Sequence, residues 1–337
     1  MTLLRELVDL GADVIAIDSE DNPVARSICG NVRVLPCSGS FMRMGRWHLN
    51  LLRRVQRLDI EHDVLFDPTG YPNVLGDHPR QAVLVHDLSM FRRGLYRRGK
   101  RTWFRLFYGR ALRKAQLRVC VSTHTRQELI ERFDLPEKGC VVVPNSLDPE
   151  FGAPIDGEPH AAMPEGPFFL TVGTIERRKN TDRLLEAFAR ADVPHCLVLA
   201  GRPGTGSEEI LRRAAGLGER VLILTGTSDV ELRHLYRRAT ALLFPSLEEG
   251  FGLPILEAMQ SDLPVLTANV SAMPEVAGDA ALLVDPTDVL AIRDGLVRLS
   301  RDEELRRDLV ARGRLRLPLF DARRNTQALL AHLRGLP

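Results

Sequence analysis

The chain has 337 residues, 44% of them hydrophobic and 27% charged, and its formal net charge is +2. That length exceeds one ordinary hydrophobic core and suits two α/β domains. The small net charge excludes a basic field over the whole protein, so we expect no nucleic-acid partner. No apolar stretch is long enough to span a membrane, and the opening segment MTLLRELVDLGADV is typical of a helix and not of a signal peptide.

The cysteines argue against a disulfide-stabilised or zinc-binding protein. Their number is odd and no C-x-x-C pair occurs, so neither a disulfide framework nor a zinc site is indicated. This usage favours a reducing compartment, and we expect a cytoplasmic protein. The five positions are Cys29, Cys37, Cys120, Cys140 and Cys196.

Short apolar runs, each ending in Gly, Pro, Ser, Asn or Asp, recur along the chain after a first helix-like segment, TLLRELVDLG. The runs are nearly continuous, as in strands covered on both faces of a sheet. Patterns typical of helices lie between many of them, such as NTDRLLEAFARA (180–191) and DVELRHLYRRA (229–239). The predicted strands are 13–18, 32–37, 63–68, 81–87, 117–122, 140–145, 168–173, 196–201, 221–226, 241–246, 264–269 and 281–286.

Strands that alternate with helices predict parallel, doubly wound sheets. Such a domain normally opens on a strand, and here a helix comes first, so the N-terminal domain is expected to lack its first strand. The segment 151–167 is rich in Pro, Gly and Ala and predicts a linker between Rossmann-like domains at 1–150 and 168–315. Ligands of these sheets bind beyond the C-terminal ends of the strands, so we expect the active site in a cleft between the two domains.

The loop after the strand at 241–246 carries the clearest chemistry. It contains Gly250 and Gly252 and leads into a helix with Pro254 at its start, a position where the missing N–H costs nothing. Free backbone N–H groups and the positive end of the helix dipole make such a helix start an anion site. Glycines let the backbone approach a diphosphate closely.

Two carboxylates flank this predicted anion site. Glu249 lies in the loop and Glu257 lies eight positions later in the helix. A carboxylate repels phosphate but accepts hydrogen bonds from sugar hydroxyls. The layout therefore suits a nucleotide-sugar, with a sugar and a ribose on either side of a diphosphate. The plainer interpretation is a solvated loop acid and a helix-dipole acid, which the Gly-Phe-Gly-Leu-Pro spacer argues against.

The segment EEGFGLPILE (248–257) resembles the E-x7-E motif of the retaining, GT-B-fold glycosyltransferases of family 4. The similarity extends through FFLTVGTIERRKNTDRLLEAF, LTGTSDVELRHLYRRA and PVLTANVSAMPEVAGDAALLVDP, which together cover most of 168–288. The first half is a weaker match, through VHD (85–87), VSTHTRQEL (121–129) and VVPNSLDPEF (142–151). The resemblance implies two doubly wound Rossmann-like domains, and a C-terminal helix at 316–337 that crosses back to the N-terminal domain.

The same resemblance implies roles for individual residues. Glu257 would bind the donor ribose, Glu249 would face the transferred sugar, and Arg178 and Lys179 would neutralise the diphosphate. Fixed cations beside a departing pyrophosphate stabilise charge that grows in the transition state. The backbone contacts to the donor would come from Gly250, Phe251, Gly252 and Leu253 and from the strand-end residues Gly173 and Thr174.

Two further positions keep alternative interpretations. The turn with Gly226 and Thr227 would hold the base through its backbone, or is an ordinary strand–helix connection with Asp229 as the helix cap. His86, at the end of a strand, would contact the donor sugar, or is structural with Asp87 fixing its tautomer.

A basic and aromatic segment without acids follows Leu88. Between 91 and 118 it carries eleven Lys or Arg residues interleaved with six aromatic residues, among them Phe91 and Tyr108. This composition suits an interfacial helix on an anionic membrane, and could also bind nucleic acid or form an ordinary basic helix packed on its domain. A lipid-linked acceptor would explain peripheral attachment to the inner face of the membrane.

The sequence thus predicts transfer of a hexose, with retention, from a nucleotide-sugar to the hydroxyl of a glycan or lipid-linked acceptor. GDP-mannose is the first choice of donor, because TIERRKN resembles bacterial mannosyltransferases of polysaccharide assembly, and a GDP-sugar is favoured over a UDP-sugar. No cofactor is expected. The D-x-D pattern that holds a metal in other glycosyltransferases is absent, so metal independence is predicted. The alternatives are a nucleotide-sugar epimerase and a non-catalytic donor-binding subunit.

Overall fold

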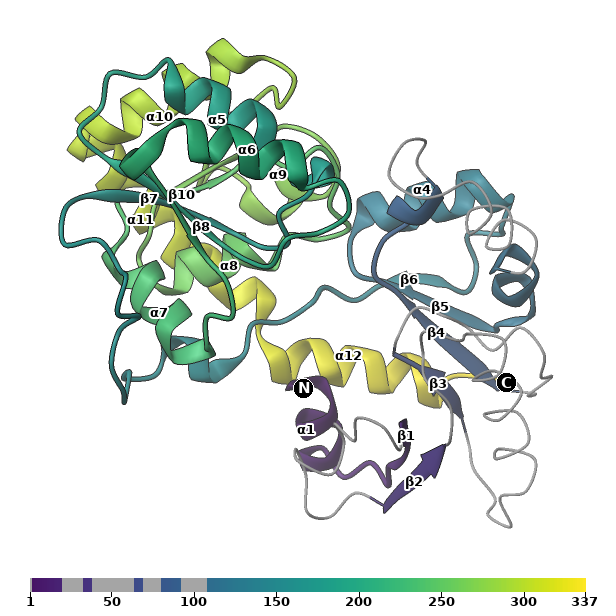
Figure 1. Cartoon of the computed structure of the whole chain (residues 1–337). Coiled ribbons are helices and arrows are strands. Elements are labelled where there is room, and N and C mark those ends of the chain that lie inside the picture. Colours follow the sequence, from purple (N-terminus) through teal and green to yellow (C-terminus); the bar gives the residue numbers. More distant parts are fainter. Residues whose placement is uncertain (1, 20–32, 38–63, 69–79, 92–107) are drawn as a thin grey trace. The chain divides into compact units, whose positions relative to one another are not determined.

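The computed structural model describes residues 2–19, 33–37, 64–68, 80–91 and 108–337 (Figure 1). The chain divides into two compact units. The first comprises Met1–Asp148 with Asp321–Pro337, and the second comprises Pro149–Phe320. No helix in these described ranges has both the length and the apolar character needed to cross a membrane.

The second unit is built on one parallel sheet of six strands. The strand order is β12-β11-β10-β7-β8-β9, and every neighbouring pair is parallel. Most positions of these strands are buried, as the continuous apolar runs require when helices cover both faces. The strands are β7 (Phe168–Val172), β8 (Cys196–Ala200), β9 (Val221–Leu224), β10 (Ala241–Phe244), β11 (Val265–Ala268) and β12 (Leu282–Val284).

Helices cover both faces of this sheet. One face carries α5 (Thr181–Ala189), α6 (Glu208–Gly216) and α10 (Val289–Arg301), whose apolar side chains pack on Phe169 and Leu243 (Figure 1). The other helices of the unit are α7 (Asp229–Arg238), α8 (Leu253–Gln260), α9 (Met273–Ala277) and α11 (Glu303–Arg316).

The strand order creates a switch point between β7 and β10. The chain runs outward from β7 to β8 and β9 on one side, and from β10 to β11 and β12 on the other. Loops that leave adjacent strands in opposite directions open a crevice at the carboxyl ends of those strands, where open α/β sheets bind ligands. The loops after β7 and β10 therefore form the expected binding edge of this unit.

The first unit contains two parallel sheets. The strand β1 (Ile15–Ser19) pairs with β2 (Arg33–Cys37), and β3 (Leu65–Asp67), β4 (Gln81–Val85), β5 (Leu117–Cys120) and β6 (Cys140–Val142) form a second sheet in chain order. Helix α1 (Thr2–Asp9) comes first, and α4 (Thr123–Phe133) follows β5. All twelve predicted strands are present, and the predicted class of two doubly wound α/β units is confirmed.

The segment 151–167, the predicted linker, groups with the second unit. Its backbone carbonyls accept hydrogen bonds from α7. Arg237 Nη2 donates to Ala153 O at 2.8 Å, and His234 Nε2 lies 2.9 Å from Gly157 O. A Pro- and Gly-rich segment has no periodic apolar face, so its sequence gives no sign that a neighbouring helix anchors it through main-chain carbonyls.

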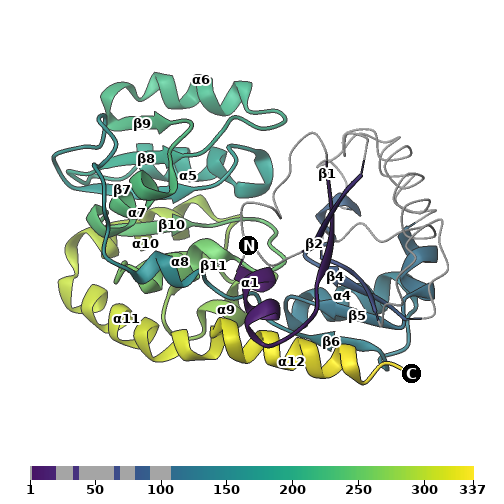
Figure 2. The same cartoon turned by 90° about the horizontal axis from the view of Figure 1, so that it is seen from below.

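The C-terminal segment 316–337 is not one helix from its first residue. Helix α11 ends at Arg316, the short 3₁₀ helix η7 (Leu317–Phe320) contains Pro318, and α12 (Ala322–Arg334) begins after the N-cap Asp321. Asp321–Pro337 group with the first unit, where α12 lies beside α1 (Figure 2).

Candidate active site

The loop after β10 enters α8 through a left-handed glycine. Gly252 has a φ of +110° and is the N-cap of α8, and Pro254 lies in the first turn. A side chain at position 252 would adopt a strained backbone, so this turn requires glycine. Among the described residues, the amide N–H groups of Phe251 and Gly252 have no hydrogen-bond partner. The loop therefore offers an anion two main-chain donors at the N-terminus of a helix.

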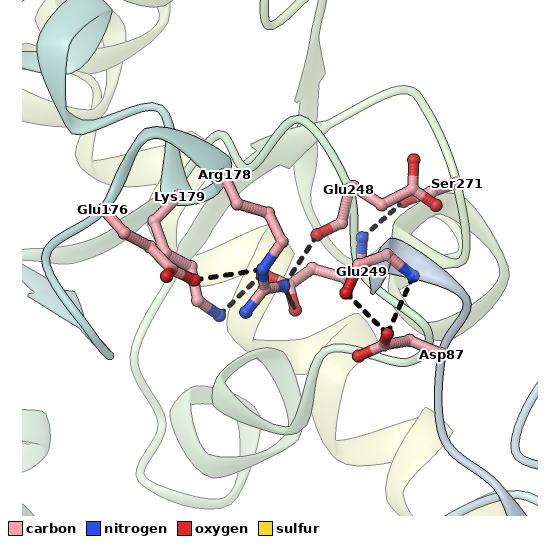
Figure 3. A network of polar contacts seen from close by, with 8 residues as sticks. Asp87, Glu176, Arg178, Lys179, Glu248, Glu249 and Ser271 are labelled. Carbon is pink, nitrogen blue, oxygen red and sulfur yellow. Dashed lines mark hydrogen bonds and ion pairs between the residues drawn. The ribbon is translucent and has the colours of Figure 1, made fainter. Parts of the chain in front are cut away.

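Glu249 is the centre of a buried ion network (Figure 3). Its Oε1 lies 2.6 Å from Lys179 Nζ, and its Oε2 lies 2.8 Å from Arg178 Nη1. The Glu249 side chain is only 10% exposed. Arg178 also donates to the Glu248 carbonyl at 2.9 Å, and Glu176 Oε1 accepts from Arg178 Nε at 3.1 Å. Two predicted cations and one predicted carboxylate thus form a single cluster at the switch point.

The loop after β7 delivers these cations. Gly173 follows the strand with a φ of +123°, and a Cβ there would lie 3.2 Å from Lys179 Cε. Lys179 Nζ lies 4.7 Å from the centre of the Phe244 ring, a cation–π contact that holds the ammonium over β10. Buried Asn180 then joins three elements, because its Nδ2 donates to Pro245 O and Pro286 O at 3.0 and 2.6 Å.

Glu257 is placed differently from Glu249. It is half-buried in α8, and its Oε2 accepts a hydrogen bond of 2.5 Å from the buried hydroxyl of Tyr236. Burial raises the pKa of the Glu257 carboxyl above its ordinary value; the Tyr236 hydrogen bond lowers it, nearby Asp229 raises it and Lys179 lowers it. Burial also raises the pKa of Tyr236 well above its usual range, and Glu257 adds to that rise.

The remaining predicted residues of this loop region differ in exposure. Gly250 is buried, and the Phe251 ring is buried against Phe320 with the ring centres 5.7 Å apart, so only the backbone of Phe251 can face a ligand. Leu253 and Thr174 are exposed.

The turn after β9 contains both predicted base-binding residues. Gly226 is exposed with a φ of +74°, and the buried Thr227 Oγ1 has no partner among the described residues. The helix cap was predicted wrongly as Asp229. Ser228 is the N-cap of α7, with a complete capping box to Glu231, because its hydroxyl reaches the Glu231 N–H three residues on.

His86 lies in the first unit, directly after β4. The imidazole is exposed, and its Nε2 lies 2.7 Å from the Pro68 carbonyl oxygen. Asp87 does not fix the tautomer of His86, as one interpretation held. Asp87 Oδ1 instead accepts from the N–H and hydroxyl of Ser89, which begins a 3₁₀ turn.

Part of the basic segment 91–118 is buried in the first unit. Phe91 and Tyr108 pack with Phe133, and the Arg118 guanidinium donates to the carbonyls of Leu112 and Gly139. Phe91, Tyr108 and Arg118 are therefore unavailable to a membrane surface. Residues 92–107 lie outside the described residues.

Sequence reasoning missed Tyr236, Asn180 and Ser271. Ser271 Oγ accepts from the Glu249 N–H at 3.1 Å and has a positive φ of +54°. The weak signals were present: a lone tyrosine in an amphipathic helix and an asparagine directly after the basic residues. Tyr236 and Asn180 form hydrogen bonds with residues far away in sequence, and local patterns do not reveal such contacts.

Comparison with known families covers nearly the whole chain. The model of "Glycosyl transferases group 1" matches residues 156–316, and that of "Glycosyltransferase Family 4" matches residues 1–151. The chain belongs to the family 4 glycosyltransferases. The family signal thus spans both units, including the ion network around Glu249 in the second.

Among curated relatives of this glycosyltransferase are two mannosyltransferases of Escherichia coli. The O-antigen chain mannosyltransferase B is 32% identical over 69% of this chain and 65% of its own length. The serotype-specific mannosyltransferase WbdA is 33% identical over 62% of this chain and 28% of its own length. The chain therefore spans less than two thirds of the first relative and less than a third of the second.

Solved structures with the same fold support the assignment of architecture. Sucrose-phosphate synthase from Thermosynechococcus elongatus has a TM-score of 0.79 at 20% identity, covering 99% of this chain and 91% of its own. WaaG, a glycosyltransferase involved in lipopolysaccharide biosynthesis, has a TM-score of 0.75 at 17% identity, covering 99% and 95%. At these identities the likeness concerns the GT-B fold alone.

Proposed function

We propose that this family 4 glycosyltransferase transfers a mannosyl group from GDP-mannose to the hydroxyl of a growing glycan or lipid-linked acceptor, with retention at the anomeric carbon. The observation that carries the proposal is the Glu249–Arg178–Lys179 cluster at the carboxyl ends of β7 and β10. The mannosyltransferases among the relatives favour mannose, and the names of two of them concern O-antigen chains and serotype.

The cations would act on the leaving group. A GDP leaving group gains negative charge as the bond to the sugar breaks, and Arg178 and Lys179 are fixed by contacts to Glu249 and Phe244 before any donor binds. Pre-oriented cations stabilise that charge without reorganisation during the reaction. The free amides of Phe251 and Gly252 would add main-chain hydrogen bonds to the phosphates.

The carboxylates would hold the sugars. Glu257, with one oxygen bonded to Tyr236, would accept from the ribose hydroxyls, and Glu249 would accept from the transferred hexose. Gly173, Thr174, Gly226 and Thr227 would line the rest of the donor site. The contact of His86 with the transferred sugar stays a prediction of the sequence; in the structure its Nε2 lies 2.7 Å from the Pro68 carbonyl oxygen.

The test is a calorimetric titration of the protein with GDP and with UDP in the presence of EDTA, on the wild type and on Glu257→Ala. We expect GDP to bind more tightly than UDP, and the affinity to fall about 10- to 100-fold in the variant, as expected for hydrogen bonds to a charged group. Activation by added Mg²⁺ or Mn²⁺ would contradict metal independence.

A product assay then separates the alternatives. Incubation with GDP-mannose and a mannose-terminated oligosaccharide should give an extended glycan and GDP, and nuclear magnetic resonance of the new linkage reports retention or inversion. Conversion of the donor sugar without an acceptor would indicate an epimerase. Tight nucleotide binding without transfer to any acceptor would indicate a non-catalytic subunit.

A further inference from the structure

A single buried tyrosine contacts the predicted ribose-binding carboxylate. Tyr236 lies in the last turn of α7, is completely buried, and donates its hydroxyl to Glu257 Oε2 at 2.5 Å. That length is typical of a strong, charge-assisted hydrogen bond from a hydroxyl to a carboxylate. No other hydrogen bond of the Tyr236 hydroxyl is found within the described part of the second unit.

The fold holds this hydroxyl in one place. The capping box of Ser228 and Glu231 fixes the start of α7, and the ring of Phe151 meets the Tyr236 ring edge-on, with centres 5.3 Å apart. The segment after Phe151 is bonded to α7 by Arg237, which donates to Ala153 O. A tyrosine side chain has only two rotatable bonds, so packing of its ring determines the position of its oxygen.

The hydrogen bond also orients the carboxylate. The last torsion of a glutamate side chain has a broad energy minimum, so a carboxylate without a partner rotates readily. Here Oε2 is bonded to Tyr236, while Oε1 has no partner among the described residues. The remaining oxygen is therefore presented in a defined direction.

The groups around Glu257 have opposing effects on the pKa of its carboxyl, and the Tyr236 hydroxyl is one of them. Burial and Asp229 raise the pKa of this carboxyl, whereas the Tyr236 hydroxyl and Lys179 lower it. An ionised carboxylate only accepts hydrogen bonds, which suits two neighbouring hydroxyl donors. Removing the Tyr236 hydroxyl would therefore raise the pKa of the Glu257 carboxyl further.

We propose that Tyr236 is a positioning residue that sets the preference of the donor site for ribonucleotides, by orienting Glu257 toward the ribose hydroxyls. The inference rests on the proposed donor site. Tyr236 touches neither the donor nor the acceptor, and acts only through Glu257.

The test uses Tyr236→Phe, which removes one oxygen and keeps the buried ring. Calorimetry at pH 7.5 compares GDP with 2′,3′-dideoxy-GDP on the wild type, Tyr236→Phe and Glu257→Ala. In the wild type we expect GDP to bind about 10- to 100-fold more tightly than the dideoxy analogue. In Tyr236→Phe that preference should fall to about threefold or less, while the affinity for the dideoxy analogue stays unchanged. Tyr108→Phe, at a buried tyrosine of the first unit, is the matched control and should keep the full preference.

A pH series separates positioning from folding. The GDP affinity of Tyr236→Phe should decrease from pH 8 to pH 6 more steeply than that of the wild type, because the pKa of Glu257 rises when its hydrogen-bond donor is removed. Binding of the dideoxy analogue should show no such difference between the two proteins.

The outcomes are distinguishable. Equal losses for GDP and the dideoxy analogue in Tyr236→Phe would mean that the hydroxyl is merely structural, and would overturn the inference. A wild-type preference that Glu257→Ala abolishes and Tyr236→Phe preserves would also overturn it, while leaving the proposed function intact. A wild type that binds neither GDP nor UDP would overturn the proposed function and the inference with it.

Discussion

Replacing Glu249 by glutamine should strengthen GDP binding while it weakens the fold. The carboxylate holds Lys179 Nζ at 2.6 Å and Arg178 Nη1 at 2.8 Å, and its side chain is only 10% exposed. A diphosphate that approaches these two cations must share them with Glu249. Glu249→Gln keeps the shape of the side chain and removes the competing charge.

The magnitude follows from these distances. At an effective dielectric constant of about 20, each contact carries about 6 kcal/mol of gross attraction, most of which offsets the lost hydration of the ions. Unpairing two half-buried cations should therefore lower the free energy of unfolding by about 2–4 kcal/mol. Removing a like charge about 6 Å from a bound diphosphate changes the interaction by about 2–3 kcal/mol before ionic screening. We expect roughly half of that to remain, which is about a tenfold gain in GDP affinity.

Calorimetry with GDP and denaturation with urea, both without donor sugar, measure the two effects separately. Glu176→Gln is the matched control, because the Glu176 carboxylate accepts from the Nε of the same Arg178 at 3.1 Å, and its side chain is 27% exposed. The control should change the GDP affinity less than twofold and the free energy of unfolding by less than about 1 kcal/mol. GDP affinity that is unchanged or reduced in Glu249→Gln would refute the view that Glu249 competes for the cations.

Two other predictions concern stability. Gly201→Ala should lower the free energy of unfolding by about 3 kcal/mol or more in urea denaturation and displace the loop after β7, since its Cβ would lie 1.9 Å from the Gly173 carbonyl oxygen. The control Gly216→Ala should be neutral or slightly stabilising, because no atom lies within 4 Å of the added Cβ. Equal effects of the two substitutions would contradict the geometry. His195 is stacked on Phe169, and burial and Arg306 lower its pKa from 6.5 in the folded protein. As the pH drops, the imidazole is therefore protonated in the unfolded chain before it is protonated in the folded one, so the free energy of unfolding should decrease below about pH 6.5. His195→Gln should flatten the pH dependence of unfolding between pH 5 and 6.5, and an unchanged profile would exclude His195 as its cause.

The sequence by itself determined the strands and the class of fold. A strand covered on both faces must be apolar at nearly every position, so Phe168–Val172 and Ala241–Phe244 are visible as uninterrupted runs. The loop into α8 could also be predicted from the sequence, because Gly252 and Pro254 satisfy backbone requirements that are local to the chain. The cap of α7 was predicted wrongly, although the capping box between Ser228 and Glu231 is local to the chain. The grouping of 151–167 with the second unit involves its anchoring by α7, which local sequence patterns do not show.

Only the tertiary structure decided which side chains meet. Glu249 and Lys179 are 70 positions apart, and they form an ion pair because β7 and β10 are neighbours in a sheet whose order differs from the order of the chain. Tyr236 reaches Glu257 because α7 and α8 both pack in the same unit, with the tyrosine ring confined by Phe151. Sequence patterns report burial and backbone geometry, which each residue experiences locally. Pairing of charges and hydroxyls depends on distances of a few ångströms between separate elements, and packing of the whole unit sets those distances.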